Sequence, residues 1–495
     1  MAINYDAYET VVGLEVHAQL LTKSKLFCGD STAFGSEPNT HVSPVTLAHP
    51  GTLPKMNRKA IEFAIKMGLA CQCEIVKENY FARKNYFYPD LPKGYQLSQH
   101  TTPICKGGYI NIKIQDRENN IRLNRIHLEE DAGKSLHDVD PENTGLDFNR
   151  AGVPLIEIVS EPDIRSGEEA YAYLTELRKL VRYLEICDGN MEEGSLRCDA
   201  NISVRKKGET KLGTRAEIKN LNSIRNVKRA IEFESKRMID MLEQGLEITQ
   251  QTRSFDADNG TTFSIRDKED AEDYRYFPDP DLTKFNLTDE FIETIRKTIP
   301  ILQKERIKKY TTEYQLSYYD ASLLTEEKDF SDYFEKVIQS FECAPLPLEG
   351  VGGRSAKPAA NWMLGPVKSW LNENSADIDQ FPLDPQKIAA IINLVEDGKL
   401  SFSVASTKLF HELIKNPNAE PGEIAEEKNW LQDSDTDHIE NLIDQVLNKF
   451  PEKVKEYKKG KKGLMGLFVG EVMKLSKGKA DPKITNDILS EKLNS

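Results

Sequence analysis

The chain has 495 residues, a length for which about three domains are expected. Its 39% hydrophobic and 29% charged residues are typical of a globular protein and exclude a fibrous or disordered chain. With 66 basic and 80 acidic residues, the formal net charge of −14 excludes a protein that coats nucleic acid indiscriminately. A local basic patch is compatible with this total.

Cysteine usage indicates a reducing compartment, and hydropathy argues against a membrane span. The seven cysteines are odd in number and irregularly spaced, which argues against a disulfide framework. The first residues lack the basic region and apolar stretch of a signal peptide. No run of about eighteen apolar residues could span a membrane. We therefore expect a cytoplasmic protein with no membrane partner.

Residues 1–292 have the pattern of a domain that mixes helices and strands. Alternating polar and apolar residues predict strands at 10–20, 109–115, 121–128, 154–159, 201–205 and 214–218. Ser166 and Glu169 have capping-box spacing and predict the start of one helix, and a second helix is predicted over 224–242. Because the strands come in groups rather than alternating with helices, we predict an α+β fold with an antiparallel sheet.

Strand signals fade after about residue 290, and the rest of the chain is predicted to be helical. Segments with helical spacing lie at 290–315, 329–342, 384–399 and 403–415, and prolines punctuate this part of the chain. We predict a helical domain over 293–402 and a helical tail domain over 403–495.

The tail is divided by charge. Residues 412–444 contain ten Asp or Glu and two Lys, a net charge of −8, whereas residues 449–479 contain ten Lys and three Glu, a net charge of +7. A uniformly solvated surface does not separate the two signs in this way. The basic segment is therefore a candidate site for RNA phosphates.

Acidic residues recur on the predicted strands. Glu15 and His17 are two residues apart and project from one face of their strand, which suits a divalent metal or a proton relay. Asp199 lies on another predicted strand, and Glu217 and Lys219 share a face of a third. Surface ion pairing explains each segment taken alone. Together they favour a cation site, because carboxylates in one sheet repel one another without a cation.

Three consecutive carboxylates follow the predicted strand at 121–128. Glu129, Glu130 and Asp131 repel one another unless a cation or a solvated turn neutralises them. The Gly-Lys-Ser sequence that follows resembles the end of a P-loop, but Leu128 stands where the first glycine is required, which excludes a Walker A motif. ATP bound here would need metal ions held by carboxylates.

Basic and aromatic side chains complete the candidate site. Arg197 and Arg215 offer guanidinium groups that suit phosphate. Residues 83–90 and 273–278 are basic and aromatic segments that contain or end in proline. Such segments can stack on an unpaired nucleotide at the end of an RNA, or they can anchor a loop against the core.

Seven motifs resemble, in order, those of the B subunits of the glutamyl/aspartyl-tRNA amidotransferases. They are GLEVH, RKNYFYPDLPKGYQ, HLEEDAGKS, NRAGVPLIEIVSEPD, SLRCDANISVR, EIKNLNS and DYRYFPDPDL. The tail, from residue 359 through 479, also resembles that family. The likeness covers nearly the whole chain, and seven motifs in register are highly specific.

The resemblance implies an ATP- and Mg²⁺-dependent ligase. Proteins of this family phosphorylate the side-chain carboxylate of Glu-tRNA(Gln) or Asp-tRNA(Asn), and ammonia then converts the acyl phosphate to the amide. The ammonia comes from glutamine through a partner amidase, which is a glutaminase, and a small third subunit completes a heterotrimer. The family's N-terminal domain is similar to the sheet of glutamine synthetase, and the helical and tail domains hold tRNA.

The resemblance also implies roles for individual residues. The positions that match the family's metal- and phosphate-handling acids are Glu15, His17, Glu130, Asp199 and Glu217. Glu129 competes with Glu130 for one of these positions, and both stay candidates. Lys84 and Tyr86 match positions near the entry of ammonia, and Arg197 and Lys219 match residues that face phosphate or the reacting carboxylate.

One departure from the family concerns zinc. Many relatives carry a CxC and CxxC cluster after the GLEVH strand, and the corresponding positions here are Cys28, Asp30, Ser43 and Thr46. One cysteine cannot hold a zinc ion in such a site, so we expect no structural zinc.

Two other functions are compatible with parts of the sequence. A metal-dependent ligase or kinase acting on a free amino acid would use the acidic strands but has no need of the basic segment at 449–479. A non-catalytic tRNA-binding scaffold would use the basic segment but has no need of the acidic strands.

Overall fold

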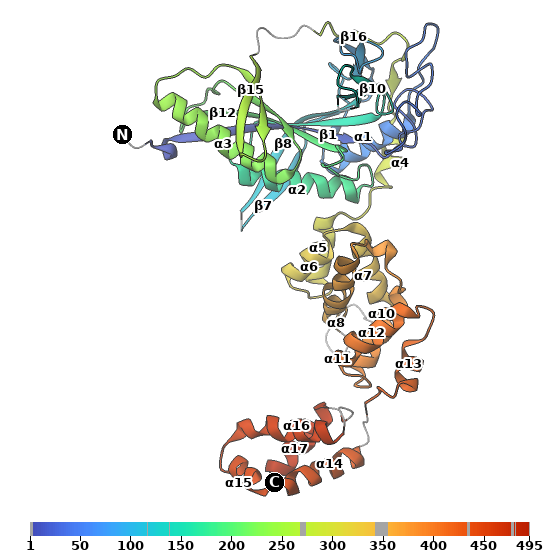
Figure 1. Ribbon diagram of the computed structural model, residues 1–495, viewed down its shortest axis with the longest axis vertical. Helices are drawn as coiled ribbons and strands as arrows, with labels where there is room; N and C mark the ends of the chain where they lie inside the picture. The colour runs from blue at the N-terminus through green and yellow to red at the C-terminus, as the bar shows by residue number, and fades with distance from the viewer. Residues whose placement is uncertain are drawn as a thin grey trace. The chain divides into compact units, whose positions relative to one another are not determined.

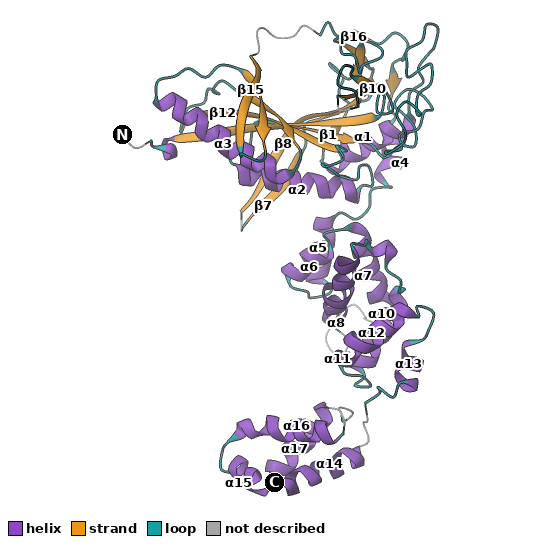
Figure 2. Cartoon of the chain, in the orientation of Figure 1, coloured by secondary structure: helices purple, strands orange, loops and turns teal. Residues whose placement is uncertain are grey.

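The computed structural model describes residues 3–115, 117–137, 139–267, 274–341, 355–432, 436–476, 480 and 482–494. The chain divides into two compact units, Met1–Leu302 and Gln303–Ser495. Strands in the described residues belong to the first unit, and the second is built from helices (Figure 2). This confirms the α+β class predicted from the sequence. No helix in the described residues is both long and apolar enough to span a membrane.

The centre of the first unit is a mixed sheet (Figure 1). Its strand order in the described residues is β15 (Thr261–Asp267), β14 (Gln251–Asp256), β13 (Ala216–Leu221), β12 (Leu196–Lys206), β1 (Tyr8–Gln19), β11 (Pro154–Ser160), β8 (Arg117–Glu130), β6 (Cys105–Lys106) and β2 (Glu74–Ile75). A further strand, β7 (Tyr109–Ile114), pairs with β8. Every predicted strand is present within a few residues of its expected bounds.

The prediction of an antiparallel sheet is wrong for one pair of strands. β13 and β14 run parallel, whereas the other pairings of this sheet are antiparallel. The chain between these two strands forms α3 (Ile224–Glu243), and a helical crossover returns the chain to the same end of the sheet.

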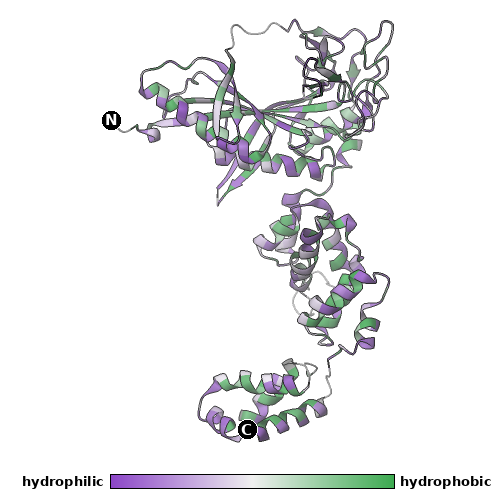
Figure 3. Ribbon diagram, viewed as in Figure 1, coloured by the Kyte–Doolittle hydropathy of each residue, from purple (hydrophilic) through white to green (hydrophobic). Residues whose placement is uncertain are grey.

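One face of the sheet is covered and the other carries polar residues. Along β1, Val12, Leu14 and Val16 are fully buried, while Glu15 and His17 alternate with them and project to the opposite side. The buried face packs against α1 (Arg58–Ala70), α2 (Gly167–Tyr183) and α3. Figure 3 shows hydrophobic and hydrophilic residues alternating along these elements, as expected when one face is buried and the other is polar.

Side-chain caps begin the two long helices of this unit. The Ser166 hydroxyl accepts from the Glu169 amide, and the Glu169 carboxylate accepts from the Arg165 amide, so the predicted capping spacing is confirmed. Ser223, rather than the adjacent Asn222, caps α3.

Smaller elements surround the sheet. Three short β-structures are β16–β4–β5 (Phe277–Pro278, Ala82–Asn85 and Tyr95–Ser98), β9–β10 (Lys134–Leu136 and Gly145–Asp147) and β17–β3 (Phe285–Asn286 and Glu78–Asn79). The predicted helical segment at 290–315 is divided around Pro300 into α4 (Asp289–Arg296) and α5 (Gln303–Thr312).

The second unit contains two separate apolar clusters. The first, from Tyr310 to Ile424, is built on α5, α6 (Tyr318–Leu324), α7 (Lys328–Ser340), α8 (Lys357–Trp362), α9 (Lys368–Asn374), α10 (Pro385–Glu396), α11 (Phe402–Val404), α12 (Phe410–Lys415) and α13 (Pro421–Glu427). The second, from Ile439 to Leu493, is built on α14 (Thr436–Lys449), α15 (Pro451–Lys458), α16 (Met465–Leu475) and α17 (Pro482–Asn494). The division at residues 292 and 402 stays a prediction.

The two charged segments of the tail lie mostly within these helices. Lys449 pairs with Glu471, and Glu456 pairs with both Lys453 and Lys461. Lys477 and Lys479 of the basic segment, and Asp433 and Asp435 of the acidic one, lie outside the described residues.

Candidate functional site

The open face of the sheet brings acidic and histidine side chains from five strands into neighbouring positions. Glu15 on β1 is opposite Asp199 on β12, and His17 is opposite Glu157 on β11. Glu157 in turn is opposite His127 on β8. Because directly opposite residues on neighbouring strands lie close together, the register alone assembles these groups.

Two imidazoles and two carboxylates form a quartet on this face. His17 Nε2 lies 3.2 Å from Glu129 Oε1 and 3.5 Å from Glu157 Oε2. His127 Nε2 lies 3.2 Å from Glu157 Oε2 and 3.8 Å from Glu129 Oε2. Within the described part of the chain, His17, Glu129 and Glu157 are the one group of three such residues whose ligand atoms all lie within 4.8 Å of one another.

The quartet has strongly altered proton affinities. Burial by itself lowers the pKa of His17, but hydrogen bonds to Glu129 and Glu157 outweigh it and raise that pKa well above its usual value. Burial likewise raises the pKa of Glu129, but hydrogen bonds from His127 and His17 outweigh it and lower that pKa to about 2. The carboxylates are therefore ionised, and protonated imidazoles balance their charge as a divalent cation could.

Glu130 lies outside the quartet and does not line the cavity. Neighbouring residues on a strand project to opposite faces, so Glu130 points away from the cavity that Glu129 lines. Its carboxylate is buried and lies 2.5 Å from the Lys93 ammonium, and it also accepts from the Leu97 amide at 2.7 Å. The structure thus brings Glu129, and not Glu130, to His17, and the expectation that Glu130 shares the site with Glu15 and His17 is not met.

A second acidic group adjoins the quartet. Lys219 Nζ lies 2.7 Å from Asp199 Oδ2 and 3.1 Å from Glu217 Oε1. Glu15 has no such cation beside it among the described residues and accepts from Asn201 at 3.0 Å. Burial, followed by repulsion from Glu157, Asp199 and Glu217, raises the pKa of Glu15.

A β-bulge places Lys219 in this group. The pairing of β12 with β13 shifts register between Cys198 and Ala200, so that an extra residue of β13 is accommodated opposite Asp199. Asn220 has a φ of 61°, in the left-handed region, and its side chain donates to the Ser254 hydroxyl at 2.7 Å. The bulge therefore determines where Lys219 and Asn220 point.

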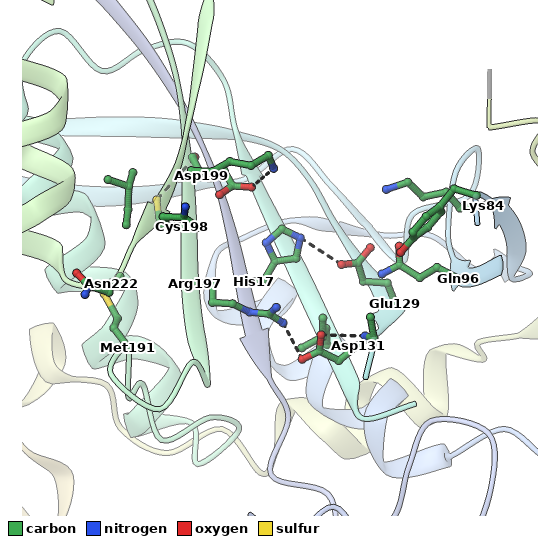
Figure 4. A pocket seen from close by; sticks show the side chains of 16 residues that line it. His17, Lys84, Gln96, Glu129, Asp131, Met191, Arg197, Cys198, Asp199 and Asn222 are labelled. Atoms are coloured by element: carbon green, nitrogen blue, oxygen red, sulfur yellow. Dashed lines mark hydrogen bonds and ion pairs between the residues drawn. The ribbon is translucent and has the colours of Figure 1, made fainter. Parts of the chain in front are cut away.

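The site is a cavity with two lobes. The larger lobe, of about 560 Å³, and the smaller lobe, of about 340 Å³, share five lining residues: His17, Lys84, Glu129, Asp199 and Lys219. The larger lobe adds apolar side chains, among them Leu155 and Met191; Met191 is labelled in Figure 4. Apart from Val159 and two tyrosines, the smaller lobe is lined by polar and charged residues.

Arg197 borders the larger lobe. Its Nη2 lies 2.7 Å from Asp131 Oδ2 (Figure 4). Gln19 donates to the same carboxylate oxygen at 2.8 Å. Burial lowers the pKa of Arg197, but the charge of Asp131 outweighs it and the net shift is upward. Asp131 thus holds a charged guanidinium at the cavity wall.

Lys84 and Tyr86 meet at the boundary between the lobes. The Lys84 ammonium lies 4.8 Å from the centre of the Tyr274 ring and 5.7 Å from that of Tyr86. Burial, followed by the charges of Glu129 and Glu130, raises the pKa of Tyr86. The two predicted residues therefore do reach the cavity, and they bring Tyr274 of the second aromatic segment with them.

Sequence reasoning missed Glu157 and His127 as partners in the quartet. Glu157 is a single acidic residue in the run Leu-Ile-Glu-Ile-Val, and that isolation within a buried strand was the available signal. His127 precedes the acidic run by two residues, in the same spacing that links Glu15 and His17. The strand pairing that joins them was not readable from the sequence.

Comparisons with known proteins show the family of the chain. The family model described as the GatB/GatE catalytic domain matches residues 10–293, which contain every residue of the cavity, and a second model, the GatB domain, matches residues 349–493. The chain belongs to the GatB family. The GatB/GatE catalytic domain thus coincides closely with the first compact unit.

Individual GatB relatives match over their full length. One from Thermodesulfovibrio yellowstonii is 48% identical over 97% of this chain and 98% of its own. One from Alkalilimnicola ehrlichii is 50% identical over 99% of this chain and 100% of its own, and one from Chlorobium limicola is 49% identical over 98% and 99%. Each of these GatB proteins is named as the B subunit of an aspartyl/glutamyl-tRNA(Asn/Gln) amidotransferase.

The four positions of the zinc-like cluster also meet within the GatB catalytic domain. Asp30 Oδ2 accepts from the Ser43 amide at 2.9 Å and from the Thr46 hydroxyl. Cys28 Sγ lies 3.3 Å from both Asp30 Oδ2 and Thr46 Oγ1. Hydrogen bonds thus connect the positions at which relatives are expected to hold zinc, while the expected absence of zinc stays a prediction.

Proposed function

We propose that this chain is the part of a tRNA-dependent transamidase that activates an amino-acid side-chain carboxylate for amidation. The substrate is Glu-tRNA(Gln), Asp-tRNA(Asn) or both, and the phosphoryl donor is ATP with Mg²⁺. A partner amidase, a glutaminase, supplies ammonia, and a small third subunit completes a heterotrimer. The names of the GatB relatives support the tRNA substrate and the multi-subunit assembly.

One observation carries the proposal: a quartet of His17, His127, Glu129 and Glu157 adjoins the acidic group of Glu15, Asp199 and Glu217 in a single cavity. Carboxylate oxygens with one imidazole are suitable ligands for a divalent cation such as Mg²⁺. His17, Glu129 and Glu157 would hold one ion, and Glu15, Asp199 and Glu217 would hold a second after the Lys219 ammonium moves aside. Bound cations would neutralise the phosphates of ATP and the charge that develops during transfer.

The chain's own residues would prepare the two chemical steps. In the first step, a side-chain carboxylate oxygen attacks the γ-phosphorus, and ADP leaves. Lys219 and Arg197 are positioned to balance negative charge at the cavity wall. In the second step, ammonia attacks the acyl carbon, inorganic phosphate leaves, and a proton is lost to give the amide.

Lys84, Tyr86 and Tyr274 are candidates for the side through which ammonia enters. They form a cation–aromatic contact at the boundary between the lobes, so an uncharged nucleophile would meet the cavity there. Enclosing the acyl phosphate would also protect it from water.

By the same family resemblance, we propose a glutamine-synthetase-like fold for the N-terminal unit and tRNA binding by the tail.

The basic segment at 449–479 supports the proposal that the tail binds tRNA. Lys458 and Lys459 follow one another at the end of α15 and make no ion pair among the residues that the structure describes. Lysines that are free of acidic partners can neutralise RNA phosphates.

The decisive experiment is reconstitution. The chain, its amidase partner, the small third subunit, ATP, Mg²⁺, glutamine and mischarged tRNA are mixed, and amidated tRNA is measured with each component left out in turn. We expect amidation to require every component, and ammonium to replace glutamine together with the amidase. Amidation of free glutamate without tRNA would instead identify a small-molecule ligase. Binding of tRNA without ATP consumption in the complete mixture would identify a scaffold.

A further inference from the structure

Arg125 is a cationic residue of the smaller lobe for which the proposed steps give no role. It lies on β8 on the same face as His127 and Glu129, because side chains two residues apart on a strand project to the same side. Its Nε is buried and has no hydrogen-bond partner in the described part of the chain. It also forms no ion pair with any acidic residue that the structure describes.

A guanidinium in this situation is unusual. A buried N–H group without an acceptor destabilises the folded state, and the effect is larger when the group is charged. Arg122 lies three residues before Arg125 on the same strand and, unlike Arg125 within the described part of the chain, forms an ion pair with Asp163. Arg125 thus faces the cavity without a partner from the described residues, as expected of an arginine that binds an anionic ligand.

The register shows where such a ligand would lie. Arg125 is opposite Val159 on β11, Val159 is opposite Glu15 on β1, and Glu15 is opposite Asp199 on β12. Neighbouring strands are about 4.8 Å apart, so Arg125 stands at one end of this row. Lys219, which pairs with Asp199, stands at the other end. The acidic group is therefore flanked by a cation on each side.

Tyr276 lines the smaller lobe together with Arg125 and provides a second donor there. Its ring stacks on His100 with centroids 4.0 Å apart and planes inclined by 9°. Burial, followed by the charge of Glu129, raises the pKa of Tyr276 to about 12, while the charge of Arg125 acts in the opposite sense. The phenol is thus protonated at neutral pH and can donate to a ligand in the lobe that Tyr276 and Arg125 both line.

We propose that Arg125 and the Tyr276 hydroxyl form a subsite for a phosphate group of the nucleotide, on the β8 side of the smaller lobe. This rests on the proposed function and names the part of the cavity that takes the polyphosphate. In an aminoacyl-tRNA the α-carboxylate is esterified, so the anions that enter the cavity are one side-chain carboxylate and the phosphates. Lys219 lies on the far side of the acidic group and Arg197 lines the larger lobe, where they can serve the carboxylate.

The test uses the complete three-subunit complex with Arg125→Gln, Arg125→Lys and the control Arg122→Gln. Arg122 is an exposed arginine on the same strand, outside both lobes. Initial rates of amidation are measured against ATP and against mischarged tRNA, and the dissociation constant of a non-hydrolysable Mg²⁺–ATP analogue is measured directly. We expect Arg125→Gln to raise the KM for ATP and this dissociation constant about tenfold, with the KM for tRNA unchanged. Arg125→Lys should recover part of the loss, and Arg122→Gln should behave as wild type.

Three results would overturn the subsite. One is an unchanged KM for ATP in Arg125→Gln, and a second is a raised KM for tRNA alone, which would assign the guanidinium to an RNA phosphate. The third is an equal loss in Arg125→Gln and Arg125→Lys with lowered thermal stability, which would indicate a structural role. Failure of the proposed function is distinguishable from all three, because then the wild-type complex itself would not amidate tRNA with ATP.

Discussion

The imidazole Nε2 of His17 lies 3.2 Å from Oε1 of Glu129, across the strand β11 that separates their own strands. Glu157 on β11 fills the gap between them and contacts His17 from the middle of the sheet. The order of strands β1, β11 and β8 therefore assembles the candidate metal centre, with one ligand residue from each strand: His17, Glu157 and Glu129.

Glu129 and Glu130 should respond differently to the same substitution. Glu129→Gln removes a charge from the quartet, so we expect amidation by the folded protein to fall at least a hundredfold. Glu130→Gln leaves Lys93 without its partner in a buried environment, so we expect the free energy of unfolding to fall by on the order of 2 kcal/mol. Denaturant titration and amidation rates, measured on both variants, check this. The reverse pattern would assign the metal centre to Glu130.

Glu15→Gln and Asp199→Asn should abolish ATP-dependent amidation and leave tRNA binding intact. Both remove charge from the group that would hold the second cation, and neither residue is part of the tail. Amidation rates and tRNA dissociation constants are the measurements. Near-normal turnover in both variants would contradict the assignment.

Divalent-cation binding should tighten as the pH rises. The pKa of His17 in the folded, cation-free protein is raised well above 6.5, so the ion pairs stabilise the fold fully below pH 6.5 and this contribution is lost as pH rises through the raised pKa. A cation needs the neutral imidazole and must displace that proton. We therefore expect Mg²⁺ to raise the thermal midpoint more at pH 8 than at pH 6.

Calorimetric titration in two buffers of different ionisation enthalpy would count the protons released. We expect release with the wild-type chain and less release with His17→Gln. Binding that releases no proton in the wild type would place the cation away from His17.

The left-handed backbone at Asn220 should matter for activity. Asn220→Gly keeps this conformation accessible, whereas Asn220→Ala imposes about 1 kcal/mol of strain and favours a shift of the bulge that positions Lys219. We expect the alanine variant to lose turnover several-fold and the glycine variant to lose less. Equal losses would indicate that the bond from Asn220 to Ser254, which both variants remove, is what matters.

The purified chain should contain no stoichiometric zinc. Cys28 is the one cysteine among the four positions, and Asp30 joins the other three by hydrogen bonds. Elemental analysis finding one zinc per chain would contradict this. Because the four positions are already in contact, replacing Asp30, Ser43 and Thr46 by cysteine should create a site that binds one zinc.

The sequence by itself determined six strands of the first unit, its two long helices and the faces of β1. Alternation along β1 separated Glu15 and His17 from the buried Val16, and the capping spacing at Ser166 began α2. These are local properties, decided by backbone geometry and hydrophobic period within a few residues. The motifs carrying the family resemblance are equally local, and the family assignment agrees with them.

Only the tertiary structure decided which groups meet. The choice between Glu129 and Glu130 and the recruitment of Glu157 and His127 depend on the order and register of strands that are separate in the sequence. The pairing of Lys219 with Asp199 depends on a single bulge. A shift of one residue in pairing would exchange Glu129 for Glu130 on the open face. The net charge of −14 says nothing of this, because the acidic side chains act through their positions on one sheet and not through their sum.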